Sequence, residues 1–126
     1  MTEIRDDLLY TESDEWVKKK NGIVRIGITD YAQEHLTDVV YVELPNVGER
    51  FESGDEIAVV ESVKSVSEIY APLGGEITAV NEDLESTPEL VNESPYDEGW
   101  LLEMEFDDEH GLETLLLPAA YEAQLD

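Results

Sequence analysis

Short β-rich runs separated by turn residues are the feature that most constrains how this chain can fold. Asn21-Gly22, a dipeptide typical of tight hairpin turns, separates the runs 16–20 and 23–28. Further runs of the same kind cover 39–44, 56–61, 66–71, 76–80 and 100–106. Many short strands with turn residues between them predict a mainly β fold, a flattened barrel or sandwich.

Helical signals are fewer and lie at the edges of this pattern. Thr29-Asp30 offers an N-cap, and Asp30 with Gln33 resembles a capping box for a short helix that ends near His35-Leu36. In the tail, Leu112, Leu115 and Leu116 share one helical face, and Pro118 suits the first turn of a last helix over 119–125. We therefore expect one domain over residues 1–126, with short peripheral helices that include a C-terminal helical segment.

The charge balance excludes several classes of partner. Asp and Glu number 32 against 7 Lys and Arg, a formal net charge of −25. A chain this acidic is repelled by nucleic acid and by anionic membranes. The acids are spread along the whole chain, and their mutual repulsion is screened only where salt is plentiful. The composition favours a halophilic origin with a salty cytoplasm; the alternative is a surface adapted to one basic partner.

Other simple features point to the cytoplasm. No run of 18 apolar residues is present, so no membrane span is expected. The N-terminus lacks the basic region and apolar stretch of a secretory signal. The chain has no cysteine, which excludes disulfides and thiolate metal sites, and we expect no metal centre.

Lys64 is the most conspicuous functional candidate. The chain has four lysines, three of them at 18–20, and Lys64 stands alone between two β-rich runs where a hairpin tip is expected. A residue at such a tip is exposed and can reach another protein's active site, and its amine can be acylated. Position alone does not separate this role from that of an ordinary solvated turn lysine.

Six segments of the chain carry a resemblance to a known family: 27–36 continuing to 45, 60–65, 71–76, 88–92, 94–96 and 99–101. Together these segments resemble the glycine cleavage H-protein family, and the resemblance covers roughly residues 9–106 without large gaps. Gly48 and Gly75 stand 16 residues before and 11 after Lys64, where lipoyl domains generally place glycines.

The resemblance implies a function for Lys64. In that family, the lysine at this position carries (R)-lipoate in amide linkage, attached by a lipoate ligase or lipoyl transferase. The arm takes the aminomethyl group of glycine from a pyridoxal phosphate-dependent glycine decarboxylase and passes it to an aminomethyltransferase. Dihydrolipoamide dehydrogenase then reoxidises the arm. The resemblance thus implies a carrier without catalytic residues of its own, and the need to visit several partners favours a monomer.

The same resemblance implies which residues surround the lipoyl arm. Ser13, Glu15, Ile28, His35 and Glu68 fall where family members line a cleft that shelters the loaded arm. A carboxylate such as Glu15 or Glu68 could hold the cationic aminomethyl group. Ordinary roles compete with these, because one residue in four is acidic and a histidine at a helix end can simply complement the helix dipole.

The resemblance also concerns two residues beside the hairpin tip and one position that differs from the family pattern. Glu61 and Ser62, which precede the tip, are candidates for recognition by the lipoylating enzyme. Asp14 stands where many family members have histidine, which would change the polarity of the cleft without affecting attachment at Lys64.

Three other functions compete with that of a glycine cleavage carrier. Biotinyl carriers use the same hairpin-tip lysine but typically flank it with methionines, where this chain has Val63 and Ser65. A lipoate relay, which stores lipoate for transfer to other proteins, has the same sequence pattern as a glycine cleavage carrier. An enzyme built on His35 has no nucleophile or metal-ligand spacing to support it.

Overall fold

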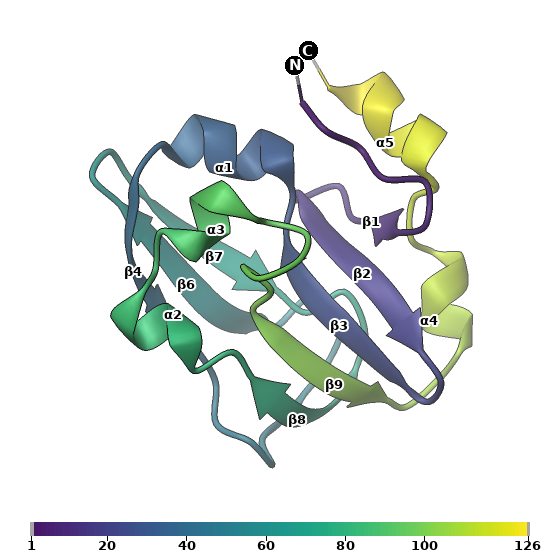
Figure 1. Cartoon of the computed structure of the whole chain (residues 1–126). Helices are drawn as coiled ribbons and strands as arrows, with labels where there is room; N and C mark the ends of the chain where they lie inside the picture. The colour runs from purple at the N-terminus through teal and green to yellow at the C-terminus, as the bar shows by residue number, and fades with distance from the viewer. Residues whose placement is uncertain (1, 126) are drawn as a thin grey trace.

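The fold is an open sandwich of two antiparallel β-sheets, seen in a computed structural model that describes residues 2–125 (Figure 1). The larger sheet has the strand order β1-β2-β3-β9-β8-β5 and the smaller one β4-β6-β7. Neither sheet closes on itself, so the sandwich form of the prediction is confirmed and a closed barrel is not formed. The strands are β1 (Leu9–Tyr10), β2 (Glu15–Lys20), β3 (Ile23–Ile28), β4 (Val39–Glu43), β5 (Arg50–Phe51), β6 (Glu56–Ser62), β7 (Val66–Tyr70), β8 (Gly75–Val80) and β9 (Leu102–Phe106).

Within residues 2–125, five short helices lie at the edges of the sheets: α1 (Asp30–Leu36), α2 (Asp83–Ser86), α3 (Leu90–Glu93), α4 (His110–Glu113) and α5 (Pro118–Gln124). The start of α1 follows the prediction, since the Thr29 hydroxyl accepts a hydrogen bond from the Ala32 amide at 3.2 Å. Helices α2 and α3 occupy a stretch that the sequence indicated only as a loop. Over residues 2–125, no helix is long and apolar enough to cross a membrane.

The C-terminal segment is helical, but not as one continuous face. Helix α4 ends before Leu115 and Leu116, and the backbone of Leu116 instead exchanges hydrogen bonds with Tyr10 at 2.7 and 2.9 Å. This pairing satisfies backbone groups of β1 that would otherwise lie at the sheet edge. Pro118 then begins α5, as its fixed backbone angle predicts.

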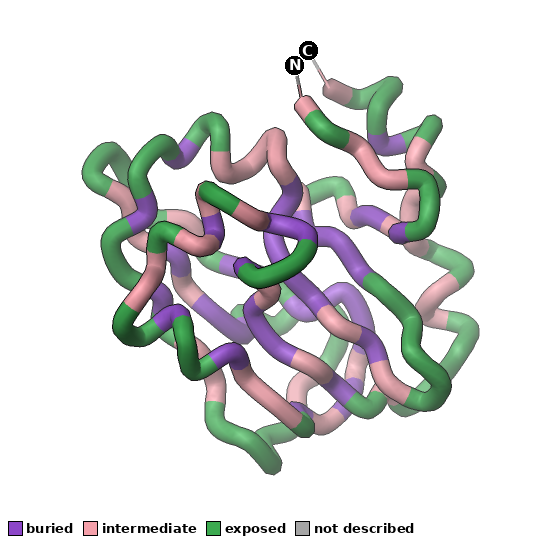
Figure 2. Tube along the Cα trace, viewed as in Figure 1, coloured by how far each residue is buried: buried purple, intermediate pink, exposed green. Residues whose placement is uncertain are grey.

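The core within residues 2–125 consists of two apolar clusters. Figure 2 shows buried positions along the strands of the sandwich. The larger one fills the space between the sheets with side chains such as Ile26, Val60 and Met104, all fully buried. The smaller one holds α5 against the larger sheet through Tyr121, whose ring stacks on Tyr10 with centroids 4.6 Å apart. The second cluster bears on the groove described below, because the Tyr121 hydroxyl donates a hydrogen bond to Asp14, which lines that groove.

Two glycines expected from lipoyl domains have clear backbone reasons. Gly48 has a φ of 96°, in the left-handed region that side chains disfavour. At Gly75, a Cβ atom would collide with the carbonyl oxygen of Glu105 on the neighbouring strand. Both positions therefore require glycine for the fold and not for contact with a ligand.

Candidate functional site

Lys64 lies at the tip of the β6–β7 hairpin, in a turn held by the side chain of Ser62. The Ser62 hydroxyl accepts hydrogen bonds from the amides of Lys64 and Ser65 at 3.2 and 2.9 Å. The Val63 amide donates to the carbonyl of Asp38 at 3.0 Å, which ties the tip to the segment before β4. These bonds hold the turn in place while the lysine side chain itself stays exposed.

The Lys64 amine is not held in an ion pair. Its Nζ atom lies 3.4 Å from the carbonyl oxygen of His35, a long contact. Among residues 2–125, no carboxylate comes within 4.0 Å of it. An exposed primary amine without a counter-ion is suited to covalent acylation.

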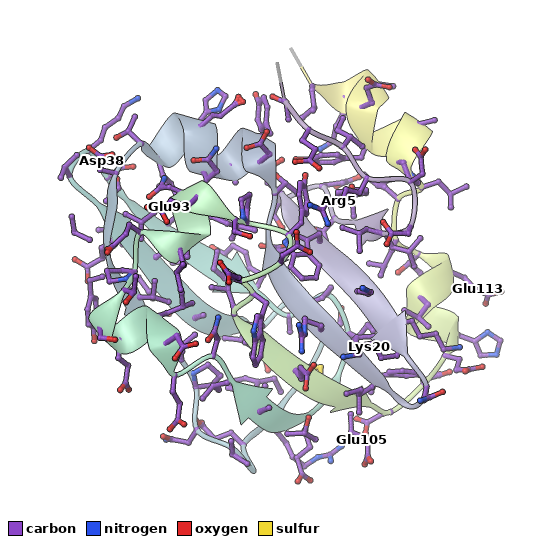
Figure 3. The ribbon with its side chains drawn as sticks, in the orientation of Figure 1. Arg5, Lys20, Asp38, Glu93, Glu105 and Glu113 are labelled. Carbon is purple, nitrogen blue, oxygen red and sulfur yellow. The ribbon has the colours of Figure 1, made fainter. Side chains whose placement is uncertain are left out.

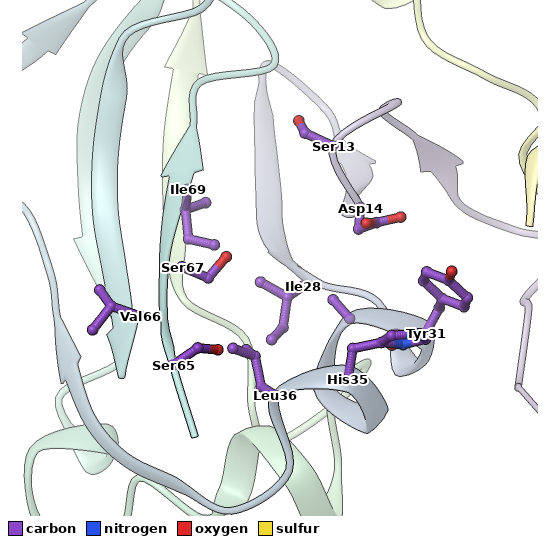
Figure 4. Close-up of a pocket in the computed structure, with 11 residues that line it drawn as sticks. Ser13, Asp14, Ile28, Tyr31, His35, Leu36, Ser65, Val66, Ser67 and Ile69 are labelled. Carbon is purple, nitrogen blue, oxygen red and sulfur yellow. The ribbon is translucent and has the colours of Figure 1, made fainter. Parts of the chain in front are cut away.

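A groove of about 310 Å³ opens beside the tip (Figure 4). It has apolar walls at Ile28, Leu36 and Ile69 and hydroxyl groups along its sides. A mixed groove of this kind suits an aliphatic chain with a small polar end. The lining residues come from the tip and β7 (Ser65, Val66, Ser67, Ile69), from β3 (Ile28), from α1 (Tyr31, Ala32, His35, Leu36) and from the loop before β2 (Ser13, Asp14).

Three of the five residues expected in the cleft lie there. Ser13, Ile28 and His35 line the groove, on three different elements. His35 is in the last turn of α1 and packs against Tyr31, with ring centroids 4.3 Å apart and the planes tilted by 38°. It therefore contributes to the wall of the groove and is also placed where a histidine complements the helix dipole.

Glu15 does not line the groove but lies behind it. Its side chain is 1% exposed, and its carboxylate accepts hydrogen bonds from the hydroxyls of Thr11 and Ser13 at 2.5 and 2.7 Å and from the Tyr70 amide at 3.3 Å. Burial raises the pKa of Glu15, and these hydrogen bonds partly oppose the rise. The carboxylate thus joins β2 to β7 and reaches the groove only through Ser13.

Glu68 lies on the other face of β7. Its neighbours Ser67 and Ile69 line the groove, and successive side chains of a strand point to opposite faces. Glu68 is exposed there, opposite Val59. Glu61 shares this outer face, because it pairs with Val66 of β7 and Tyr41 of β4.

Asp14 also lines the groove. Tyr31, Ala32 and Leu36 line it too, although the sequence did not predict them as site residues. Tyr31 and Ala32 could have been found from their helical spacing to His35, four and three residues before it, and Leu36 from its spacing of four to Ala32. Asp14 has a φ of 71°, and its Oδ1 atom accepts a hydrogen bond from the Tyr121 hydroxyl at 2.8 Å. Burial raises its pKa, against the opposing effects of that hydrogen bond and of the His35 charge.

Comparison with known proteins agrees with this geometry. The model of the "Glycine cleavage H-protein" family matches residues 8–126. A probable glycine cleavage system H protein of Natronomonas pharaonis is 53% identical over 119 residues, 94% of each chain. That of Alcanivorax borkumensis is 50% identical over 126 residues, 100% of this chain and 98% of the other.

A solved structure extends the likeness to the fold. The crystal structure of a glycine cleavage system H protein from Mycobacterium marinum superposes with a TM-score of 0.89 at 36% identity, over 96% of this chain and 98% of the other. With the exposed lysine at the hairpin tip, these likenesses show that the chain belongs to the glycine cleavage H-protein family, the non-catalytic lipoyl-carrying shuttles of the glycine cleavage system.

Proposed function

We propose that this chain carries (R)-lipoate on Lys64 and moves the aminomethyl group of glycine between the enzymes of a glycine cleavage system. The observation that carries the proposal is the exposed, unpaired Lys64 amine at the end of a groove with apolar and hydroxyl walls. An amide at Nζ would extend the side chain by an aliphatic acyl chain long enough to lie along that groove or swing away from it.

The residues present fit lipoate. Ile28, Leu36 and Ile69 offer apolar contact for the hydrocarbon part, and Ser65 and Ser67 line the groove next to the attachment point. When bound, lipoate supplies a disulfide that accepts a one-carbon amine fragment together with two electrons.

The chain's own residues hold and shelter what is attached. Ser62 fixes the turn, so that Lys64 projects from a defined point. The apolar walls exclude water from the groove, and Ser13 adds a polar group whose hydroxyl is oriented by Glu15. A group tethered at Lys64 is delivered to a partner at high effective concentration, which a free intermediate would lack.

The proposed partners are those of the family: glycine decarboxylase, aminomethyltransferase, dihydrolipoamide dehydrogenase, and a lipoate ligase or lipoyl transferase that modifies Lys64. We propose that Glu61 and Ser62, beside the tip, take part in recognition by the modifying enzyme. We place the carrier in the cytoplasm as a monomer, one lipoyl-carrier domain that meets its partners in turn.

We also propose that the acidic surface is an adaptation to high salt. The acids behind the net charge of −25 are spread along the whole chain, and their self-repulsion falls as salt screens exposed charges.

Intact-mass spectrometry with peptide mapping, on the protein from its native cells, tests the attachment. We expect one lipoyl group, on Lys64. A biotinyl group there would move the chain to the carboxylase carriers. An unmodified Lys64 that a competent lipoate ligase also refuses would contradict the proposal.

A second measurement tests the shuttle role. The lipoylated chain, added to a purified glycine decarboxylase, should support release of carbon dioxide from glycine, and the unmodified chain should not. A lipoylated chain that supports no release would leave the lipoate relay as the better function.

A further inference from the structure

The groove beside Lys64 contains one carboxylate, although the chain as a whole is strongly acidic. Among the groove-lining residues within 2–125, Asp14 alone is acidic. Glu15 is buried behind the groove with both carboxylate oxygens engaged, and Glu68 lies on the opposite face of β7. A cationic group in the groove would therefore meet the charge of Asp14 first.

A chain of hydrogen bonds holds the Asp14 carboxylate in place. The Tyr121 hydroxyl donates its proton to Asp14 Oδ1 at 2.8 Å, so the 2.7 Å bond between Thr29 and Tyr121 has Thr29 as its donor. Thr29 in turn accepts from the Ala32 amide at the start of α1. The C-terminal helix α5 thus orients Asp14 through Tyr121, whose ring is fixed by stacking on Tyr10.

One oxygen of Asp14 is left for a ligand. Among the hydrogen bonds within residues 2–125, Oδ1 receives the Tyr121 proton and Oδ2 receives none. In Figure 4, Ser13 and Asp14 lie across the groove from Ser65 and Ser67, which follow the attachment point directly. A group carried on Lys64 would enter between these two walls.

Ser13 offers a second acceptor next to Asp14. Its hydroxyl donates its proton to Glu15 at 2.7 Å, which leaves the oxygen lone pairs to accept a bond from an ammonium group. Glu15 is accordingly a positioning residue that acts through Ser13. This arrangement assigns a different role to Glu15 from the direct contact expected from the sequence.

We propose that Asp14 is the counter-charge for the cationic amine at the end of the lipoyl arm, with Ser13 as the neighbouring acceptor. The proposal rests on the proposed function of Lys64. A half-buried carboxylate attracts a cation more strongly than an exposed one, because water screens the pair less. The other acids within residues 2–125 are exposed, engaged elsewhere or, like Glu61, on the outer face of the smaller sheet, so they contribute mainly to the general negative potential.

A stable surrogate of the loaded arm tests the assignment. Because the chain has no cysteine, the two thiols of the reduced lipoyl group are the only thiols of the lipoylated protein. Alkylation with 2-bromoethylamine gives an arm that ends in ammonium, and alkylation with 2-bromoethanol gives an arm that ends in a neutral hydroxyl. The amide resonances of Ile28, Tyr31 and Ser67 report how much of each arm occupies the groove.

We expect the ammonium arm to occupy the groove more than the hydroxyl arm. Asp14→Asn should lower the occupancy constant of the ammonium arm about tenfold, the loss typical of one charge-assisted hydrogen bond, and leave that of the hydroxyl arm unchanged. Glu12→Gln, a matched charge change at an exposed neighbouring position, should have no such effect. Tyr121→Phe, which keeps the Asp14 charge but releases its orientation, should give a smaller loss than Asp14→Asn.

The outcomes separate this inference from the proposed function. Equal occupancy of the ammonium arm in the parent chain and in Asp14→Asn would overturn the role of Asp14 while lipoylation of Lys64 stands. A tenfold loss in Glu68→Gln instead would transfer the role to Glu68. Refusal of the chain by a competent lipoate ligase, seen by intact mass before any alkylation, would overturn the proposed function and the inference with it.

Discussion

The two hairpins β2–β3 and β6–β7 both place lysine near a tight turn, but the lysines nearest the two turns have different surroundings. On β2–β3, Lys19 pairs with Glu109 at 2.9 Å and Lys20 approaches Glu103 at 3.8 Å, while Lys18, farther from the turn, is exposed and in no ion pair within residues 2–125. On β6–β7, the hydrogen-bond contact of the Lys64 amine within the same residues is the carbonyl oxygen of His35. Figure 3 labels Lys20 near the turn of the first hairpin and Asp38, which hydrogen-bonds the tip of the second, at the opposite end of the molecule.

A combination therefore distinguishes Lys64: it lies at a hairpin tip and no carboxylate pairs with its amine within residues 2–125, whereas Lys19 and Lys20 face carboxylates and Lys18 lies within a strand. The first hairpin lies in the sheet that also contains Arg25 and Arg50, whose guanidinium groups pair with acids. The smaller sheet bears acids on its outer face, at Glu43, Glu61 and Glu68, and none of these is in an ion pair within residues 2–125. Lys64 projects from the end of this acidic sheet as an isolated cation.

Exchanging the lysines for arginine gives the largest expected effect. Lys64→Arg keeps the positive charge but removes the primary amine that forms the amide, so we expect complete loss of lipoyl incorporation. Lys19→Arg, the matched change on the other hairpin, should be modified like the parent chain. Intact mass after incubation with lipoate ligase measures both, and lipoyl incorporation into Lys64→Arg would show that another lysine is the site.

Much of the structure of the two hairpins was predictable from the sequence, and the features that were not predicted have a physical reason. The Asn21-Gly22 turn, the hairpin turn at Lys64 and the helix after Thr29 all follow from local patterns, and the structure confirms them. The two-residue strand β1 was not predicted, because two residues have no periodicity. The groove was predicted only in part, since the face on which Glu68 lies depends on the register of β7, and the hydrogen bond from Tyr121 to Asp14 joins residues 107 positions apart.

Glu15 links the two hairpins, and its removal should separate them. In Glu15→Gln, an NH2 group takes the place of one carboxylate oxygen. That oxygen is either the one that accepts from the Tyr70 amide or the one that accepts from Thr11 and Ser13, so a donor then faces a donor. We expect a loss of about 1–3 kcal/mol in the free energy of unfolding, as for an unsatisfied buried group. Urea unfolding at neutral pH measures it, and a loss confined to a few tenths would show that the link is dispensable.

Glu15 also makes the free energy of unfolding depend on pH, in a direction that follows from its raised pKa. Burial raises the pKa of Glu15 above the 4.5 of a free glutamate, so the folded chain binds this proton more tightly than the unfolded chain does. The part of the stability that comes from binding this proton is therefore present below about pH 4.5 and is lost as the pH rises through the folded pKa. The difference in unfolding free energy between parent and Glu15→Gln should change across this window, and a constant difference would contradict the raised pKa.

The two turns should respond differently to small changes. Asn21 has a φ of 59°, so Asn21→Ala should cost about 1 kcal/mol through backbone strain, with no effect on lipoylation. Ser62→Ala should cost about 1 kcal/mol through its lost hydrogen bonds and should also slow lipoylation, because the Lys64 turn loosens. Thermal unfolding and ligase kinetics on both variants make the comparison. Equal lipoylation rates would mean that the ligase does not depend on the shape of the tip.

Salt should affect the two hairpins to different degrees, and this is the smallest of the expected effects. Raising salt from about 0.1 M to about 2 M shortens the screening length from about 10 Å to below about 3 Å. Along the smaller sheet, Glu43 and Glu68 flank Val59 in one row, so screening removes repulsion between acids. Along β2–β3, salt removes the same general repulsion but also weakens exposed ion pairs, each worth up to about 1 kcal/mol. Amide hydrogen exchange should therefore slow more in β6 and β7 than in β2 and β3. If the exchange rates did not change with salt in either hairpin, the halophilic interpretation would be contradicted. Equal slowing in both hairpins would leave that interpretation intact and would show that the surface ion pairs contribute nothing measurable.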